Sequence, residues 1–154
     1  MAQYKKVVAE NRKAFFDYHI LDTLEAGIVL NGNEVKSIRS GRVNLRDSFA
    51  RQEKGELWLF NMHVSPYKFG RIDDINPLRQ RKLLLNKSEM KRIIAKSSEK
   101  GLAIIPLKIY FFGNYAKVEI ALGKGKKEFD KRDSIKKKDL DRDMNRELVD
   151  RNRE

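Results

Sequence analysis

The sequence changes character at Gly123, and this change limits what the chain can fold into. Before it, residues 115–122 alternate apolar and polar side chains, as a strand does when one face is buried. After it, residues 124–154 contain 12 basic and 9 acidic residues and few apolar ones, so they cannot build a core of their own. We therefore expect a flexible N-terminus over 1–10, a folded body over 11–123, and a basic joint with a charged tail over 124–154.

The tail combines fair helix propensity with a narrow apolar stripe. Leu140, Met144 and Leu148 recur at intervals of four residues, which places them on one side of a helix. Isolated helices of this length are only marginally stable in water. We expect the tail to be disordered in the free chain and helical when bound. Gly123 and Gly125 lie among basic residues before the tail and predict a flexible joint.

The body has the pattern of short strands separated by turns. Asn and Gly at 31–33, Lys-Gly at 54–55 and Gly-Asn at 113–114 are residues suited to turns. The run 83–85 is expected in the core, with room for one member to point outward because strand neighbours face opposite sides. The remaining expected strands cover 14–24, 26–30, 43–51, 56–64, 102–112 and 115–122, with a hairpin across 43–64.

Two helices interrupt the strands. One is expected over 34–40, with Asn33 as its N-cap and Gly41 at its end. The other follows a capping-box pattern at 86–89, presents Met90, Ile93, Ile94 and Ser97 on one face, and ends at Gly101. Residues 65–80 form a connection without clear periodicity. Short strands with few helices predict a mainly β fold, a small antiparallel barrel.

The composition points to an anionic partner. The formal net charge is +12, which favours nucleic acid or an anionic membrane, although added solubility is the simpler alternative. No apolar run approaches the roughly 20 residues that span a bilayer, and the N-terminus has no signal-peptide pattern, so membrane binding is the weaker reading. The chain has no cysteine, which excludes thiolate chemistry and suits a cytoplasmic protein.

Catalytic patterns are weak. The two histidines, His19 and His63, have no helix-spaced partner, and His19 is expected to be exposed. Gly123 and Gly125 lack the further glycine of a dinucleotide loop. Scattered carboxylates do not single out a metal site. We expect no catalytic residue, no metal and no cofactor, and keep an RNA-processing enzyme only as an alternative that chelator-sensitive nuclease activity would support.

RNA binding explains more of the sequence. Barrels of this size carry RNA on an open face through basic and aromatic side chains. An ordinary solvated charge is the alternative for each single lysine. The candidates are Asn11, Arg12 and Lys13, Lys36 and Arg39 on the first helix, Arg79, Arg81 and Lys82, Lys117, and the basic joint.

An ordered set of segments also resembles a known family. These are Asn11-Arg12-Lys13-Ala14, Tyr18, Glu25-Ala26-Gly27-Ile28, Gly32 with Glu34-Val35-Lys36-Ser37, Gly41 with Asp47-Ser48, Arg79 with Arg81-Lys82-Leu83-Leu84-Leu85, Gly101, Ile105-Pro106-Leu107, Lys117-Val118, Gly125-Lys126-Lys127 and Asp130-Lys131-Arg132. Together they resemble the SmpB family (small protein B), the SsrA-binding proteins of bacterial trans-translation. The resemblance spans nearly the whole chain.

The resemblance implies an OB-like barrel with two to three peripheral helices and a non-enzymatic role. The body would bind the tRNA-like domain of transfer-messenger RNA and stand in for the anticodon arm. The pair would enter ribosomes stalled on non-stop messages, so that the nascent chain is tagged for degradation. The implied partners are this RNA and the small-subunit decoding centre and mRNA channel. The free protein is expected to be monomeric and cytoplasmic.

The resemblance also carries roles to particular residues. RNA binding is implied for Asn11, Arg12, Glu25, Leu84 and Lys117. The ribosome-directed step is implied for Gly125, Lys126, Lys127, Asp130, Lys131 and Arg132, with phosphate contacts from Lys136, Lys137 and Lys138 as the tail enters the vacant mRNA channel. Phe16 stands where other members often have histidine, so it can stack on a base but cannot hydrogen-bond. Acidic residues at 139, 141 and 143 argue against charge alone driving insertion of the tail.

A general RNA-binding barrel of the translation apparatus, similar to a ribosomal protein or an initiation factor, is the alternative function. The tail separates the two hypotheses, because only the adaptor needs it for a step after RNA binding.

Overall fold

The structure, a computed structural model, describes residues 5–66 and 76–153, with side chains described as far as residue 146. Its strands are β1 (Lys5–Glu10), β2 (Tyr18–Ile28), β3 (Val43–Asn44), β4 (Phe49–Glu53), β5 (Glu56–Phe60), β6 (His63–Val64), β7 (Arg81–Leu84), β8 (Ala103–Phe112) and β9 (Tyr115–Gly125). Its helices are α1 (Arg12–Asp17), α2 (Gly32–Arg39), α3 (Lys87–Lys100) and α4 (Glu128–Arg153).

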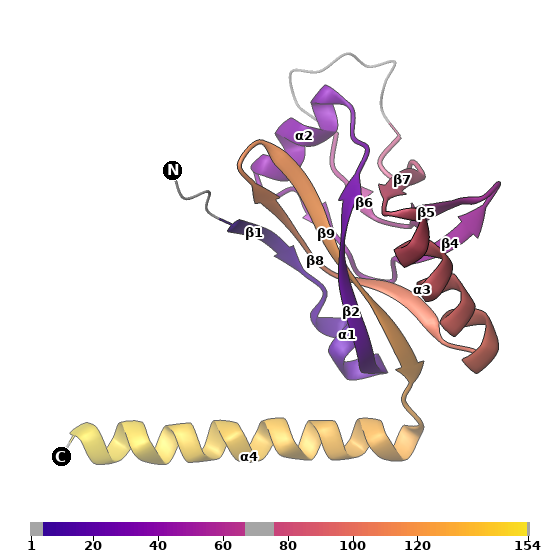
Figure 1. Cartoon of the computed structure of the whole chain (residues 1–154). Coiled ribbons are helices and arrows are strands. Elements are labelled where there is room, and N and C mark those ends of the chain that lie inside the picture. The colour runs from indigo at the N-terminus through magenta and orange to yellow at the C-terminus, as the bar shows by residue number, and fades with distance from the viewer. Residues whose placement is uncertain (1–4, 67–75, 154) are drawn as a thin grey trace.

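The sheet closes on itself. Its strand order is β1-β8-β4-β5-β7-β2-β9, and β8 also pairs with β9, so six strands form a ring to which β1 adds an edge. Every pairing is antiparallel, and the β4–β8 seam consists of the single pair Ala50 and Ile104. Figure 1 shows the small helices around this barrel and the long helix α4, which passes below α1 and extends beyond the barrel. The predicted mainly β, antiparallel barrel is confirmed.

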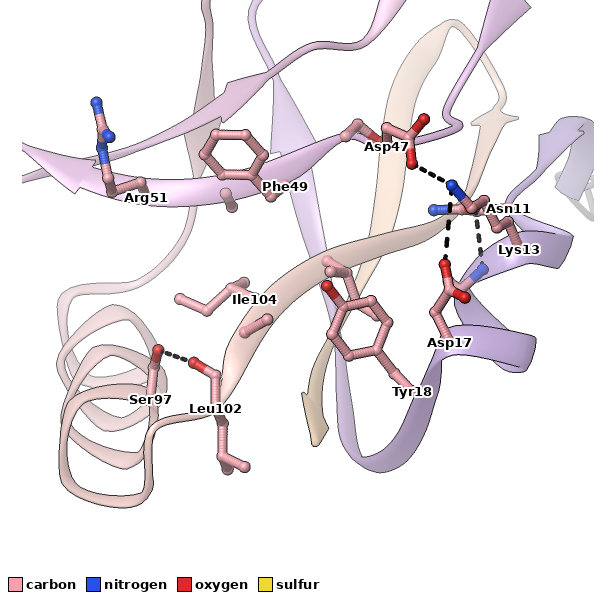
Figure 2. Close-up of a pocket in the computed structure, with 15 residues that line it drawn as sticks. Asn11, Lys13, Asp17, Tyr18, Asp47, Phe49, Arg51, Ser97, Leu102 and Ile104 are labelled. Carbon is pink, nitrogen blue, oxygen red and sulfur yellow. Dashed lines mark hydrogen bonds and ion pairs between the residues drawn. The ribbon is translucent and has the colours of Figure 1, made fainter. Parts of the chain in front are cut away.

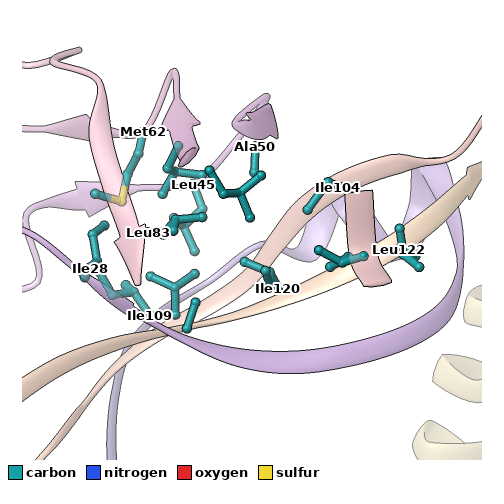
Figure 3. Packing of buried hydrophobic residues seen from close by; sticks show 14 of the residues in the cluster. Ile28, Leu45, Ala50, Met62, Leu83, Ile104, Ile109, Ile120 and Leu122 are labelled. Atoms are coloured by element: carbon teal, nitrogen blue, oxygen red, sulfur yellow. The ribbon is translucent and has the colours of Figure 1, made fainter. Parts of the chain in front are cut away.

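The barrel interior is apolar and draws on strands far apart in the sequence. Figure 3 shows side chains of β2, β4, β7, β8 and β9 meeting there. Val118, Ile120 and Leu122 of β9 are buried, as the alternation predicted. On β7, Leu83 enters the core while Leu84 stays half-exposed, so one leucine of the run does point outward.

The N-terminal part differs from the sequence-based expectation. The flexible N-terminus is wrong for residues 5–10, because β1 pairs with β8. Four of the six side chains of β1 are exposed and only Val8 and Ala9 pack against the core, so backbone hydrogen bonds place this edge strand without a clear apolar alternation in its sequence. The strand over 14–24 is also wrong at its start. Asn11 caps α1 with its side chain, and β2 then runs unbroken through both extended segments predicted at 14–24 and 26–30.

The two predicted helices exist, with changed caps. α2 begins at Gly32, and its N-cap is Asn31 rather than Asn33, because Asn31 and Glu34 bind each other's backbone N–H groups in a capping box. α3 follows Asn86, whose side chain makes no capping hydrogen bond, so the predicted capping box is wrong. The end of α3 is as predicted, with Gly101 in the left-handed region at φ 61°.

The predicted hairpin is present, but its strands are shorter than expected. Lys54 and Gly55 both have positive φ, as a tight two-residue turn between β4 and β5 requires. Asp47 and Asn61 also have positive φ, and these positions separate β3 from β4 and β5 from β6. The expected strands at 43–51 and 56–64 are therefore each split in two. Most of the expected irregular connection at 65–80 lies outside the described residues.

The joint is structured. β9 continues to Gly125, where it pairs with Tyr18 of β2, so the two glycines belong to the barrel rather than to a hinge. After two residues α4 begins and continues for 26 residues. The tail is thus a helix in the chain alone, where disorder before binding was expected. Among the described residues, no helix is long and apolar enough to cross a membrane.

Gly123 offers a direct test of this packed joint. A Cβ at Gly123 would lie 3.0 Å from Tyr18 Cβ and 3.1 Å from Ile105 Cδ1, whereas a Cβ at Gly125 would meet nothing within 4 Å. We expect Gly123→Val to lower the free energy of unfolding by about 1–3 kcal/mol through overpacking. Gly125→Val is the matched control and should change it by less than about 0.5 kcal/mol. Urea denaturation measures both, and equal values would show that position 123 is a hinge after all.

Candidate nucleic-acid interface

Three residues implied in RNA binding lie together in one open groove. Glu25 comes from β2, Leu84 from β7 and Lys117 from β9, and the groove also includes Leu24, Gly27, Leu85, Asn86 and Glu89. The strand registers explain this meeting, because Gly27 of β2 pairs with Leu84 on one side and with Lys117 on the other. Gly27 has no side chain, and Leu84 Cβ lies 3.2 Å from where a Cβ would stand. Leu84 therefore packs against the backbone of Gly27, between the polar side chains that line the groove.

Glu25 is the most constrained polar group of this groove. Its carboxylate accepts hydrogen bonds from Lys117 Nζ at 2.5 Å and from the Tyr110 hydroxyl. The bond from Lys117, and then the bond from Tyr110, lowers the pKa of Glu25 below its ordinary value. The side chain is nevertheless 48% exposed. The groove thus presents a carboxylate that stays ionised at neutral pH, beside a lysine and an exposed leucine.

Asn11, Arg12 and Lys13 separate into different roles. The side chain of Asn11 is buried, donates to the Pro106 carbonyl at 2.9 Å and caps α1. In the structure Asn11 shapes the start of α1, and its expected contact with RNA stays a prediction. Arg12 is exposed and lines an open groove with Phe16.

Lys13 is held by two carboxylates. Its Nζ lies 2.6 Å from Asp47 Oδ1 and 4.0 Å from Asp17 Oδ2. The hydrogen bond from Lys13 lowers the pKa of Asp47. Figure 2 shows both carboxylates directed at the amine, at one end of a pocket of about 360 Å³ between α1, β4 and the start of β8. This lysine therefore ties α1 to the loop before β4.

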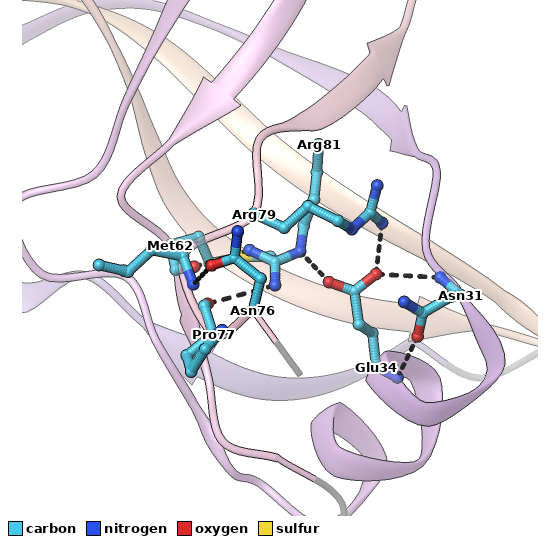
Figure 4. Close-up of polar contacts among 8 residues, drawn as sticks. Asn31, Glu34, Met62, Asn76, Pro77, Arg79 and Arg81 are labelled. Atoms are coloured by element: carbon cyan, nitrogen blue, oxygen red, sulfur yellow. Dashed lines mark hydrogen bonds and ion pairs between the residues drawn. The ribbon is translucent and has the colours of Figure 1, made fainter. Parts of the chain in front are cut away.

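Arg79 and Arg81 serve the barrel. The side chain of Arg81 is 0% exposed, and its guanidinium binds the Glu34 carboxylate and the carbonyls of Met62 and Pro77. Arg79 binds the other oxygen of Glu34, as Figure 4 shows. The expectation that Arg81 contacts RNA is thus corrected, because no part of it reaches the surface. The sequence did not indicate this burial, because Arg81 stands among other basic residues that look equally suited to the surface.

The other basic candidates stay at the surface. Lys82 is partly exposed, with Nζ 3.5 Å from Glu56 Oε1. Lys36 and Arg39 are exposed near the end of α2, where Arg39 lies over the Phe111 ring at 4.4 Å. These residues do not line the groove that contains Glu25.

The joint residues dock the tail on the body. Lys126 donates from its backbone to the Asp17 carbonyl at 2.8 Å and from Nζ to the Phe15 carbonyl at 3.0 Å. Asp130 Oδ2 lies 3.2 Å from His19 Nε2, and this hydrogen bond lowers the pKa of Asp130. Lys131 Nζ lies 3.6 Å from Asp17 Oδ1. These contacts set the direction in which α4 leaves the barrel.

The other candidate residues of the joint and tail face solvent. Gly125, Lys127, Arg132, Lys136, Lys137 and Lys138 are exposed, and Lys138 lines the same open groove as Arg12. His19 is exposed as predicted. Sequence reasoning missed Asp17, His19 and Phe15 as docking partners because each lies more than 100 residues from the joint. It missed Tyr110 because an apolar run surrounds that residue. No group of three or more potential metal ligands occurs in the described part of the chain.

Comparison with known proteins identifies the family. A family model described as SmpB protein matches residues 8–150. The chain belongs to the SmpB family. Among its relatives is an SsrA-binding protein of Carboxydothermus hydrogenoformans, which is 59% identical over 144 residues, covering 94% of this chain and 97% of that protein. An SsrA-binding protein of Enterococcus faecalis is 51% identical over 148 residues, covering 96% of each chain.

A solved SmpB structure supports the fold. It is described as "tmRNA-SmpB: a journey to the center of the bacterial ribosome" and superposes with a TM-score of 0.67 at 48% identity. The match covers 82% of this chain and 93% of the other. The barrel with peripheral helices is thus the SmpB fold, and the resemblance stated from the sequence is confirmed.

Proposed function

We propose that this SmpB family member is an RNA-binding adaptor of trans-translation that binds the tRNA-like domain of transfer-messenger RNA. The groove of Glu25, Leu84 and Lys117 carries this proposal, because three residues from three strands assemble there into one exposed surface. Relatives named SsrA-binding proteins and the solved tmRNA-SmpB complex support it. The division of labour is between an RNA-binding barrel, from β1 to β9, and the ribosome-directed joint and tail that follow β9.

The body combines positional contacts with a general positive field. Lys117 and Arg12 neutralise phosphates, and Lys13, Lys36, Arg79 and Lys82 add long-range attraction. Leu84 offers an apolar surface to a base or a ribose, and Glu25 accepts hydrogen bonds from RNA donors. Asn11 and Arg81 hold α1 and α2 in place on the barrel.

The tail acts after RNA binding. As a helix of 26 residues, α4 is about 39 Å long, enough to extend well beyond the body. Its exposed lysines at 136, 137 and 138 suit a channel lined by phosphates. In this proposal the body occupies the position of an anticodon arm on a stalled ribosome. The docked joint then aims α4 into the vacant mRNA channel beside the decoding centre.

The role is that of a binding protein. The adaptor needs no cofactor and no catalytic residue, since pairing of the RNA and the ribosome requires only surfaces. We place it in the cytoplasm, where stalled ribosomes are, as a monomer before it meets its RNA.

Affinity purification followed by sequencing of the bound RNA tests the function. The expected result is one dominant RNA that contains both a tRNA-like part and a short coding part. A Glu25→Ala variant should lose most of this RNA, whereas Glu53→Ala, which removes an exposed carboxylate on β4, should retain it. A broad mixture of ribosomal and messenger RNAs would instead support the general RNA-binding barrel.

A further inference from the structure

Four side chains form a continuous row across neighbouring strands on the outer face of the barrel. Glu25 lies on β2, Lys117 on β9, Tyr110 on β8 and Lys5 on β1. The registers place them side by side, because Tyr110 pairs with Lys117 and Lys117 pairs with Gly27, two residues from Glu25. The row begins in the RNA-binding groove and ends on the edge strand.

Tyr110 is buried without being part of the apolar core. It is 1% exposed, yet it belongs to neither of the two apolar clusters inside the barrel. Lys5 covers its ring, with Nζ 4.2 Å from the ring centre. Its hydroxyl donates to Glu25 Oε2. Burial and the bond to Glu25 raise the pKa of Tyr110, so the hydroxyl remains a proton donor at neutral pH.

The geometry leaves Glu25 partly available. A carboxylate has about four lone-pair positions, of which Tyr110 and Lys117 each occupy one. Because one donor binds each oxygen, the plane of the carboxylate is fixed while its outer positions still face the groove. A freely rotating glutamate would lose side-chain entropy when it binds RNA. The two hydrogen bonds within the protein already restrict Glu25, so part of this entropy is lost before binding.

We propose that Tyr110 is a positioning residue of the groove, whose hydroxyl holds the Glu25 carboxylate as an oriented acceptor for a hydrogen-bond donor of the RNA. This inference rests on the proposed function, since it names how the same groove recognises its RNA. The donor is a ribose 2′-hydroxyl or an amino group of a base. The charged groups around the row are Lys5, Lys117, Glu89 of α3, and Glu119, which pairs with Lys108 at 3.1 Å.

A double-mutant cycle tests the inference, with affinity measured for the tRNA-like domain transcribed in vitro. Tyr110→Phe keeps the ring under Lys5 and removes only the hydroxyl. We expect it to weaken binding about three- to tenfold. In a Glu25→Ala background the same change should have no further effect, because Tyr110 acts through Glu25. Tyr115→Phe, at an exposed tyrosine of β9, is the matched control and should leave affinity unchanged.

Two further measurements distinguish a role of Tyr110 in positioning Glu25 from a role in the stability of the fold. Removing the hydroxyl should raise the pKa of Glu25 in an NMR titration of the free protein, since one donor to the ionised form is lost. Lys5→Ala, which uncovers the ring and removes one positive charge, should weaken binding more in the wild-type background than in the Glu25→Ala background, where only the loss of the charge remains. This variant keeps the test valid if Tyr110→Phe fails to fold.

Substituted RNAs identify the donor. RNA with 2′-fluorine in place of the 2′-hydroxyl, or with inosine for guanosine at unpaired positions, removes one donor class at a time. The class whose removal makes wild type and Glu25→Ala bind equally is the donor to Glu25. The inference would be overturned if Tyr110→Phe weakened RNA binding equally in the wild-type and Glu25→Ala backgrounds. It would also be overturned if Tyr110→Phe did not weaken RNA binding in the wild-type background at all. A wild-type protein that fails to bind the tRNA-like domain would instead overturn the proposed function.

Discussion

Replacing Arg81 by methionine is expected to lower the free energy of unfolding by about 3–5 kcal/mol, because it removes the fully buried cation that binds the buried Glu34 carboxylate. Arg81 reaches Glu34 and two backbone carbonyls from a fully buried position. In the variant the Glu34 carboxylate keeps only Arg79 as a cationic partner. The carbonyls of Met62 and Pro77 also lose their hydrogen bonds from Arg81. Urea denaturation at neutral pH measures the loss.

Neighbouring variants define the cause. Lys82→Met removes the adjacent, partly exposed charge and should change the free energy of unfolding by less than about 0.5 kcal/mol. The double variant Glu34→Gln, Arg81→Met should recover part of the loss, since the stranded carboxylate is gone. An Arg81→Met protein as stable as the Lys82→Met protein would show that the buried pair does not hold α2 to β7.

The same pair predicts an acid dependence of stability. Burial raises the pKa of Glu34, but hydrogen bonds from Arg79 and the Asn31 N–H, with the attraction of Arg81, outweigh it. The folded pKa is therefore below its ordinary value of 4.5. A lowered folded pKa means that the contribution is complete above pH 4.5 and is lost as the pH falls through the folded value. Stability of Glu34→Gln should accordingly decline less steeply in this acid range.

Truncation after Lys126 is expected to abolish tagging on stalled ribosomes. Affinity for the tRNA-like domain should stay within about twofold, because salt screens the attraction between the distant charges of the tail and an RNA bound to the body. The cut preserves all of β9 and the bonds from Lys126 to Asp17 and Phe15, so the barrel remains complete. Filter binding measures RNA affinity, and a reconstituted translation reaction on a non-stop message measures tagging.

A point substitution separates the helix from its charge. Lys137→Pro removes one exposed lysine and breaks α4, at a cost of about 3 kcal/mol within a helix. Lys137→Ala removes the same charge and keeps the helix. We expect tagging to fail with proline and to persist with alanine. Equal loss of tagging in the two variants would mean that the charge of Lys137, rather than helical form, is what the ribosome recognises. Loss of RNA affinity on truncation would contradict the division of labour itself.

The docked joint changes how the basic motif at 125–132 is understood. The sequence suggested a flexible hinge followed by a disordered tail. In the structure the polar groups of Lys126, Asp130 and Lys131 bind residues of α1 and the start of β2. Lys127 and Arg132 remain exposed. The motif therefore combines residues that aim the helix with residues free to meet a partner.

Sequence alone determined the features that depend on neighbours along the chain. Period-two alternation located β9, the positive-φ turn at 54–55 located the β4–β5 hairpin, and Gly101 located the end of α3. The charge contrast at Gly123 separated body from tail. The ordered motifs indicated the SmpB family. Each of these signals is local or is an ordered set of local signals, which a linear pattern preserves.

Tertiary structure alone decided what the polar residues do. Arg12 and Arg81 look alike in a basic sequence, yet one is exposed and the other is enclosed, because only Arg81 lies on a barrel strand opposite a buried carboxylate. Tyr110 meets Glu25 from 85 residues away. Burial and hydrogen-bond partners come from strand register across the closed sheet, and register joins residues that no local pattern connects.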